Sequence, residues 1–120
     1  MREIKVSMPY IGKSLSCNHW KYKGGMYTRK ETKQWMEALG WQIVTHHIED
    51  WRQPITVRID GIFKDKRSCP DLHNLVKVVC DSIEEVTGLN DRNYKTETGE
   101  PLIRHDEEPT ILITVRENDA

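Results

Sequence analysis

The segment between Lys64 and Lys95 contains the residues whose types and spacing suit the hydrolysis of a phosphodiester. Asp71 stands where a predicted helix begins, Asp81 lies ten residues further along, and Asp91 follows the helix in a turn. Carboxylate oxygens are the ligands that Mg²⁺ prefers, and a cation held by them polarises a phosphate and lowers the pKa of an attacking water. If the turn folds back on the helix, the three carboxylates converge on one metal site.

The predicted helix has an apolar side and a polar side. At about 100° per residue, Leu75, Val79 and Ile83 share a side that must pack inward. The polar side carries Asn74, Lys77, Asp81 and either Glu84 or Glu85. Lys77 lies about one turn from Asn74, so its ammonium group is placed to stabilise the charge that develops on a phosphate in the transition state.

Each carboxylate also has an interpretation that involves no chemistry. Asp71 is a good helix N-cap, Asp81 can be a solvated residue on the exposed side of the helix, and Asp91 follows Asn90 in a typical turn pair. Residue types alone therefore leave a structural and a catalytic interpretation open for all three aspartates.

The order and spacing of these residues resemble the RusA family of Holliday junction resolvases. The family's motif is Asp-x-Asp-Asn, then a Lys and an Asp, then a downstream Asp pair; the matching positions here are Asp71-Leu72-His73-Asn74, Lys77, Asp81 and Asp91. The similarity also covers the strand before the motif, the basic segment 64–67 and the last strand. It implies that Asp71 and Asp91 are catalytic metal ligands, that Lys77 is catalytic, and that Asp81 is a further acidic position near the site.

This resemblance implies a function for the whole chain, taken as a single domain over residues 1–120. Members of the family are metal-dependent endodeoxyribonucleases that cleave branched DNA such as the four-way junction in recombination and repair, and they are often carried by prophages. They use Mg²⁺ or Mn²⁺ and act as homodimers, so that paired nicks can be made across a two-fold junction. The exposed apolar surface that a dimer needs is expected from Trp20, Trp35, Trp41 and Trp51.

Two positions depart from the family pattern. His73 stands where the motif usually has its second Asp, and Asn90 stands where the downstream pair usually has its first. The metal ligands expected in this chain are Asp71, His73, Asp81 and Asp91. Because an imidazole suits Mn²⁺ and softer metals better than Mg²⁺, we expect weaker use of Mg²⁺ than of Mn²⁺. The alternative is a protein of the same fold that binds junctions but has weakened or lost cleavage.

The three cysteines, Cys17, Cys69 and Cys80, indicate neither a disulfide framework nor a common zinc finger. Their number is odd and no Cys-x-x-Cys pair is present, although Cys69 and Cys80 together with His73 offer zinc ligands as a further alternative. Reduced thiols indicate a cytoplasmic protein. No apolar run approaches the roughly 20 residues that cross a bilayer, and the first residues form no apolar signal segment, so we expect no membrane association.

Charge is unevenly distributed along the chain. The net charge is -1 and the isoelectric point is about 6.5, yet residues 13–33 contain six basic side chains and one acidic side chain. Aromatic residues are interleaved with these bases, which is typical of segments that stack on nucleic acid, although the same aromatics can simply close the edge of a core. The side chains expected to contact DNA are Lys13, Trp20, Lys21, Lys23, Arg29, Lys66, Arg67, Asn74 and Arg92.

The elements that must position these residues predict an α+β fold. Alternating apolar residues indicate strands at 3–9, 55–63 and 110–116, whereas residues 10–28 show no helical period and are expected to form a long loop. A first helix is expected from a Thr28–Glu31 capping box to about His47, and Gly88 ends the second helix. We therefore expect a small mixed β-sheet with two main helices packed on it, in a strand order that the sequence leaves open.

Overall fold

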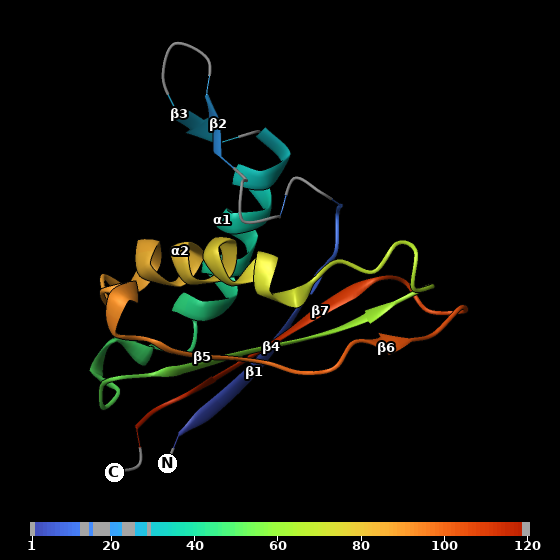
Figure 1. Cartoon of the computed structure of the whole chain (residues 1–120). Helices are drawn as coiled ribbons and strands as arrows, with labels where there is room; N and C mark the ends of the chain where they lie inside the picture. Colours follow the sequence, from blue (N-terminus) through green and yellow to red (C-terminus); the bar gives the residue numbers. More distant parts are fainter. Residues whose placement is uncertain (1, 13–14, 16–19, 23–25, 29, 119–120) are drawn as a thin grey trace.

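A mixed β-sheet with two helices on one of its faces forms the core (Figure 1). The computed structural model describes residues 2–12, 15, 20–22, 26–28 and 30–118. The sheet contains β1 (Glu3–Pro9), β4 (Thr56–Phe63), β5 (Lys95–Thr98), β6 (Leu102–Ile103) and β7 (Thr110–Arg116). Its order is β1-β7-β4-β5, with β6 also beside β4; β7 is antiparallel to both neighbours, whereas β5 and β6 run parallel to β4. The predicted α+β class is confirmed.

The three long strands lie where the alternation of apolar residues predicts them. Along β4, Val57, Ile59 and Phe63 are buried and alternate with partly exposed residues, and β7 buries Ile111 and Ile113 in the same way. Each such side chain stabilises the fold by roughly 1.5–3 kcal/mol when it leaves water. Ile59 pairs directly with Ile113. A shift of one residue would turn this apolar row toward solvent, so the burial of one face fixes the register.

Part of the segment predicted as a loop forms a hairpin. Strands β2 (Trp20–Tyr22) and β3 (Met26–Thr28) pair antiparallel, and Figure 1 shows them standing away from the main sheet beyond the first turn of α1 (Lys30–Val44). Three residues per strand are too few for an alternation of apolar and polar residues to be recognised. The loop prediction for residues 10–28 is therefore wrong at these two strands.

The first helix packs on the sheet through residues four apart. Trp35, Leu39 and Ile43 of α1 are buried, and the Trp35 indole Nε1 donates a hydrogen bond to the carbonyl oxygen of Pro9 at 2.6 Å. The predicted capping box is wrong, because Thr28 belongs to β3 and the helix begins only at Lys30. The helix also ends at residue 44, before the predicted limit. None of the helices in the described part of the chain has both the length and the apolar character needed to cross a bilayer.

The tryptophans expected on the surface are divided between core and surface. Trp35 and Trp51 are 4% and 5% exposed, whereas Trp41 on α1 is 73% exposed. The side chain of Trp20 lies outside the described part of the structure. The prediction of a shared apolar surface is therefore wrong for Trp35 and Trp51, because burial of their large apolar rings stabilises the core instead.

Strands β4 and β5 are joined by a helical crossover that carries the predicted site. After β4 the chain forms η3 (Leu72–Leu75) and α2 (Val76–Thr87), and η4 (Asp91–Asn93) then leads into β5. Because β5 is parallel to β4, the crossover must return the chain from the end of β4 to the level at which β4 begins. Asp71 therefore lies at one end of the crossover and Asp91 at the other.

The second helix is held against the first by a close contact. A Cβ atom added at Gly40 of α1 would lie 2.7 Å from Cγ1 of Val86 on α2. Only a glycine permits this approach, and the two helices cross at a steep angle above the sheet (Figure 1). The apolar side of α2 is buried as predicted, since Val79 and Ile83 are both fully buried. Its polar side is left at the edge of the molecule.

Candidate active site

Lys77 and Asp81 form an ion pair on the polar side of α2. They are four residues apart, a spacing that places side chains on the same face of a helix. The Lys77 Nζ atom lies 3.1 Å from Oδ1 of Asp81. The lysine side chain is 53% exposed and the aspartate side chain 15% exposed. The carboxylate is therefore mostly buried, whereas the ammonium group is accessible to a ligand from solvent.

Asp91 is brought to the same place by the turn that follows α2. Gly88 ends the helix with φ 75°, a left-handed conformation that glycine adopts without strain. The hydroxyl group of the buried Tyr94 donates a hydrogen bond to the carbonyl oxygen of Leu89 at 2.8 Å. This bond joins the last residue of the turn to its beginning. Oδ2 of Asp91 lies 3.9 Å from Nζ of Lys77. Helix and turn thus present two carboxylates to one lysine.

A third carboxylate completes what we call the acidic cluster, formed by Asp81, Glu84 and Asp91. One oxygen from each residue lies within 4.8 Å of the others, and all three residues are partly buried. Sequence periodicity left Glu84 and Glu85 equivalent, and Glu84 is the one that joins the cluster. Both are at same-face spacings from Asp81, three residues for Glu84 and four for Glu85, so the sequence held no signal that chooses between them.

Electrostatics keep Lys77 charged and the neighbouring thiol neutral. The hydrogen bond to Asp81 raises the pKa of Lys77, and the charges of Asp91 and Glu84 act in the same direction. Burial raises the pKa of Cys80, on the inner side of α2, to about 12, and the charges of Asp91 and Asp81 add to this effect. At neutral pH this thiol therefore keeps its proton.

The ligands gathered at this edge fit a hard divalent cation. Three carboxylates supply several oxygen atoms at short mutual distances, and Mg²⁺ and Mn²⁺ both prefer oxygen ligands. A cation would also offset the repulsion among the three like charges. The cluster can therefore hold such an ion next to a positively charged side chain.

Asp71 lies outside the acidic cluster and acts as a helix cap. Its Oδ1 accepts a hydrogen bond from the backbone N–H of His73 at 3.0 Å, and its φ and ψ of -74° and 120° are those of an N-cap residue. Asp81 lies ten positions further along η3 and α2, which corresponds to at least roughly 15 Å along the axis at about 1.5–2.0 Å per residue. The structure thus brings two of the three predicted carboxylates together and leaves Asp71 at the far end of the crossover.

His73 is also outside the cluster, on the side of the crossover that faces β5. Its Nε2 atom lies 3.4 Å from the hydroxyl oxygen of Thr98, and its side chain is exposed. Within the described residues, the acidic cluster is the group of possible metal ligands that converges; Cys69, His73 and Cys80 do not form a second one. The zinc alternative is therefore not supported.

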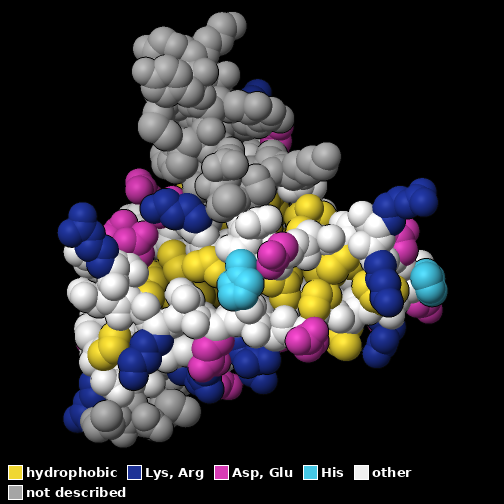
Figure 2. All heavy atoms as spheres, in the orientation of Figure 1, with side chains coloured by type: hydrophobic (Ala, Val, Ile, Leu, Met, Phe, Trp, Pro, Cys, Tyr) yellow, Lys and Arg dark blue, Asp and Glu magenta, His cyan; other side chains and the backbone are white. Residues whose placement is uncertain are grey.

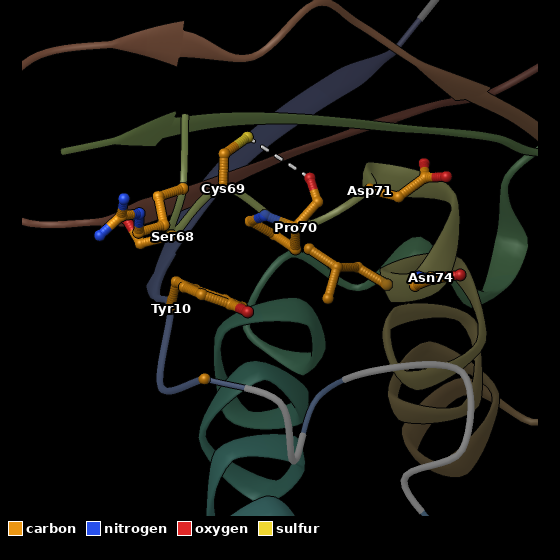
Figure 3. A pocket seen from close by; sticks show the side chains of 9 residues that line it. Tyr10, Ser68, Cys69, Pro70, Asp71 and Asn74 are labelled. Atoms are coloured by element: carbon orange, nitrogen blue, oxygen red, sulfur yellow. Dashed lines mark hydrogen bonds between the residues drawn. The ribbon is translucent and has the colours of Figure 1, made fainter. Parts of the chain in front are cut away.

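A hollow of about 440 Å³ lies beside Asp71 at the start of η3. We call it the N-terminal pocket; its lining is Tyr10, Gly12, Arg67, Ser68, Cys69, Pro70, Asp71, Asn74 and Leu75. Figure 3 shows Asp71 and Asn74 together on the helical side and Tyr10 on the opposite side. The Tyr10 ring meets Phe63 edge to face, with 5.4 Å between the centroids. Tyr10 thus closes the core and also lines this pocket.

The predicted DNA contacts are only partly described. Lys66, Arg67, Asn74 and Arg92 are all exposed. Lys66 and Arg67 precede η3, and Arg92 follows Asp91 directly, so these bases flank both ends of the crossover. Lys13, Lys23 and Arg29 and the side chains of Trp20 and Lys21 lie outside the described residues. On the face shown in Figure 2, the basic and acidic side chains in view are interspersed and do not form a single basic surface.

A small α+β domain with carboxylates and a lysine gathered at the open edge of a crossover helix belongs to the class of metal-dependent nucleases. The family described as Endodeoxyribonuclease RusA matches residues 15–116, and the chain is a member of this RusA family. It is thus a DNA endonuclease of the Holliday junction resolvase type, and nucleases of this family depend on a metal ion. No individually curated protein matches the chain.

Proposed function

We propose that the acidic cluster and Lys77 form the centre at which this endonuclease hydrolyses a phosphodiester of branched DNA. The observation that carries the proposal is the double contact of Lys77, whose Nζ lies 3.1 Å from Asp81 and 3.9 Å from Asp91. A fixed positive charge next to convergent oxygen ligands is what an anionic, pentacovalent transition state requires. The four-way junction is the proposed substrate, because the family resolves such junctions.

Asp81 and Asp91 are the proposed ligands of Mg²⁺ or Mn²⁺ in this centre. Such a cation, when bound, polarises the phosphate and lowers the pKa of an attacking water. Asp71 and His73 remain proposed ligands because they match the family motif. They lie outside the acidic cluster, so their contribution needs a test separate from that of the two aspartates.

Lys77 is proposed to act as a permanent charge and not as a base. Its hydrogen bond to Asp81 raises its pKa, so the ammonium form persists through the neutral range. Its side chain is about half exposed, and its flexible stem allows Nζ to leave the carboxylate and meet a phosphate oxygen. Protonated Lys77 then stabilises the charge that develops on the phosphate in the transition state.

Exposed bases beside the crossover are proposed to hold the DNA backbone. Arg92 follows Asp91 in η4, whereas Arg67 lines the N-terminal pocket and Lys66 precedes it in the chain. Contacts of this kind position a duplex without reading its sequence. A homodimer is proposed as the acting form, because two copies of the centre related by a two-fold axis can nick two strands of a four-way junction.

The test is cleavage of a labelled synthetic four-way junction and of a linear duplex, each with Mg²⁺ or Mn²⁺. We compare the native protein with Asp91→Asn and with Glu85→Gln, which removes an exposed carboxylate of α2 outside the acidic cluster. Paired nicks in the junction, lost in Asp91→Asn and retained in Glu85→Gln, are expected. A junction that is bound in a gel shift but never cut with either cation would contradict the proposed centre.

A further inference from the structure

Glu84 makes a contact to the Asp91 turn that its place in the acidic cluster does not require. Its Oε2 accepts a hydrogen bond from the backbone N–H of Asp91 at 3.0 Å, across seven residues and the turn at Gly88. The main chain of Glu84 also contributes, since its carbonyl oxygen accepts the N–H of Gly88 at 2.8 Å. One residue of α2 thus holds both the beginning of the turn and the first residue of η4.

Most other hydrogen bonds of this turn join its residues to one another, and one, from the N–H of Leu89 to Oγ1 of Thr87 at 3.2 Å, reaches the last residue of α2. The Tyr94 N–H donates to the carbonyl oxygen of Asp91, the Tyr94 hydroxyl to that of Leu89, and the side chain of Asn90 accepts the N–H of Arg92. These bonds give the turn its shape. The bond to Glu84 connects Asp91 itself to the helix that carries Lys77 and Asp81, and so positions Asp91 relative to them.

We propose that Glu84 is a positioning residue that fixes Asp91 opposite Lys77 through its hydrogen bond to the Asp91 backbone. This inference rests on the proposed function, since it concerns the carboxylate that is proposed to be a metal ligand. A hydrogen bond from an amide N–H to a carboxylate is stronger than one between neutral groups. The Asp91 N–H is half-buried there, and without Glu84 it would lose this partner. A displacement of about 1 Å at a reacting centre can lower a rate by about 100-fold.

Two conservative variants separate positioning from ligation of the cation. Glu84→Gln keeps the length and an acceptor oxygen but loses the charge, whereas Glu84→Asp keeps the charge but shortens the reach to Asp91 by one methylene. Positioning predicts that Glu84→Gln stays within about fivefold of the native cleavage rate and that Glu84→Asp and Glu84→Ala lose about 10- to 100-fold, the range for residues that orient metal ligands. Glu85→Ala, one residue away and exposed, is the matched control and should cleave like the native protein.

The experiment measures junction cleavage at limiting and saturating Mn²⁺ together with hydrogen exchange of the Asp91 amide by NMR. In Glu84→Ala the amide should exchange at least about tenfold faster than in the native protein, because it loses its charged acceptor; in Glu84→Gln, which keeps a neutral acceptor, the exchange rate should lie between the two. The Glu84→Gln and Glu84→Asp pair remains decisive even if Glu84→Ala fails to fold.

Two results would overturn the proposal. If Glu84→Gln is as defective as Glu84→Ala while Glu84→Asp is active, Glu84 acts through its charge. If Glu84→Ala cleaves at the native rate, the bond does not position Asp91 for catalysis. Asp91→Asn is measured in parallel: if it is inactive while Glu84→Ala is active, only the positioning role fails. If Asp91→Asn cleaves normally, the proposed centre and the positioning role both fall.

Discussion

The two ends of the crossover hold their acidic residues in different ways. At the end next to β5, Asp81 and Asp91 face a lysine and form part of a cluster of charges. At the end next to η3, the carboxylate of Asp71 accepts a backbone N–H and stands beside a hollow lined partly by apolar side chains. Aspartates thus form ion pairs with a lysine at one end, whereas an aspartate caps a helix at the other. Residues of one sequence motif need not share one physical role.

The largest effect is expected from Lys77→Met, which removes the positive charge that contacts both Asp81 and Asp91. Cleavage of the junction at saturating Mn²⁺ should fall by about 100- to 1000-fold, the cost of losing a group that stabilises transition-state charge. Single-turnover rates measure this effect, and Lys77→Arg serves as the control that keeps the charge. A Lys77→Met cleavage rate within threefold of the native rate would mean that the charge of Lys77 does not contribute to catalysis.

Asp71→Asn tests whether the capped end also takes part in catalysis. Asparagine is as good an N-cap as aspartate, so the free energy of unfolding should change by less than about 0.5 kcal/mol, whereas Asp71→Ala should lose about 1 kcal/mol. If Asp71 binds metal as the family motif implies, Asp71→Asn should still cleave about 100-fold more slowly. Urea unfolding and junction cleavage are measured on the same preparations. Native cleavage by Asp71→Asn would show that the residue is a cap alone.

A smaller effect is expected from His73→Asp, which restores the residue that the family motif has at this position. A carboxylate suits Mg²⁺ better than an imidazole does, so the ratio of the Mg²⁺ rate to the Mn²⁺ rate should rise by about tenfold at limiting metal. His46→Asp is the control, because His46 is exposed beyond the end of α1 and far from the crossover in sequence. An unchanged ratio would mean that His73 does not contact the cation.

The sequence predicts those parts of the fold whose signal is local. Strands β1, β4 and β7 alternate apolar and polar residues over seven or eight positions, and their predicted limits agree with the observed ones to within one residue. The edge strand β5 carries no such signal, because its Lys-Thr-Glu-Thr sequence has no apolar alternation and its residues are mostly exposed. The strand order could not be predicted from local sequence patterns, because pairs such as Ile59 and Ile113 join residues far apart in the chain.

The same division between local and long-range information applies to the candidate site. The Lys77–Asp81 pair follows from a spacing of four residues in any helix that contains both. Glu84 and Glu85 were left equivalent because they differ by about 100° around the axis, and only the packing of α2 decides which one faces the cluster. The return of Asp91 to α2 depends on Gly88 and on the crossover to a parallel strand. The sequence also could not show that this crossover separates Asp71 from Asp91.

The smallest effect is expected away from both ends of the crossover, where the two ends of the described chain meet. The carboxylate of Glu117 accepts hydrogen bonds from the side chain and backbone of Arg2 and from the backbone N–H of Arg52. The hydrogen bond from the Arg2 side chain is the main reason why the pKa of Glu117 falls from 4.5 to about 2. A folded-state pKa below the unfolded value stabilises the fold above pH 4.5, and this contribution is lost as the pH falls from 4.5 toward 2.

Glu117→Gln should therefore lower stability at neutral pH and reduce the loss of stability on acidification. The two unfolding curves, measured in urea at a series of pH values, should approach each other between pH 4.5 and pH 2. Junction cleavage at neutral pH should stay at the native rate, because Glu117 belongs to neither end of the crossover. Parallel pH profiles for the two proteins would contradict the Arg2–Glu117 contact, and a loss of cleavage in a folded Glu117→Gln protein would mean that the pairing of the chain ends influences the centre. The variant thus separates effects on stability from effects on catalysis, which the comparison of the two ends of the crossover requires.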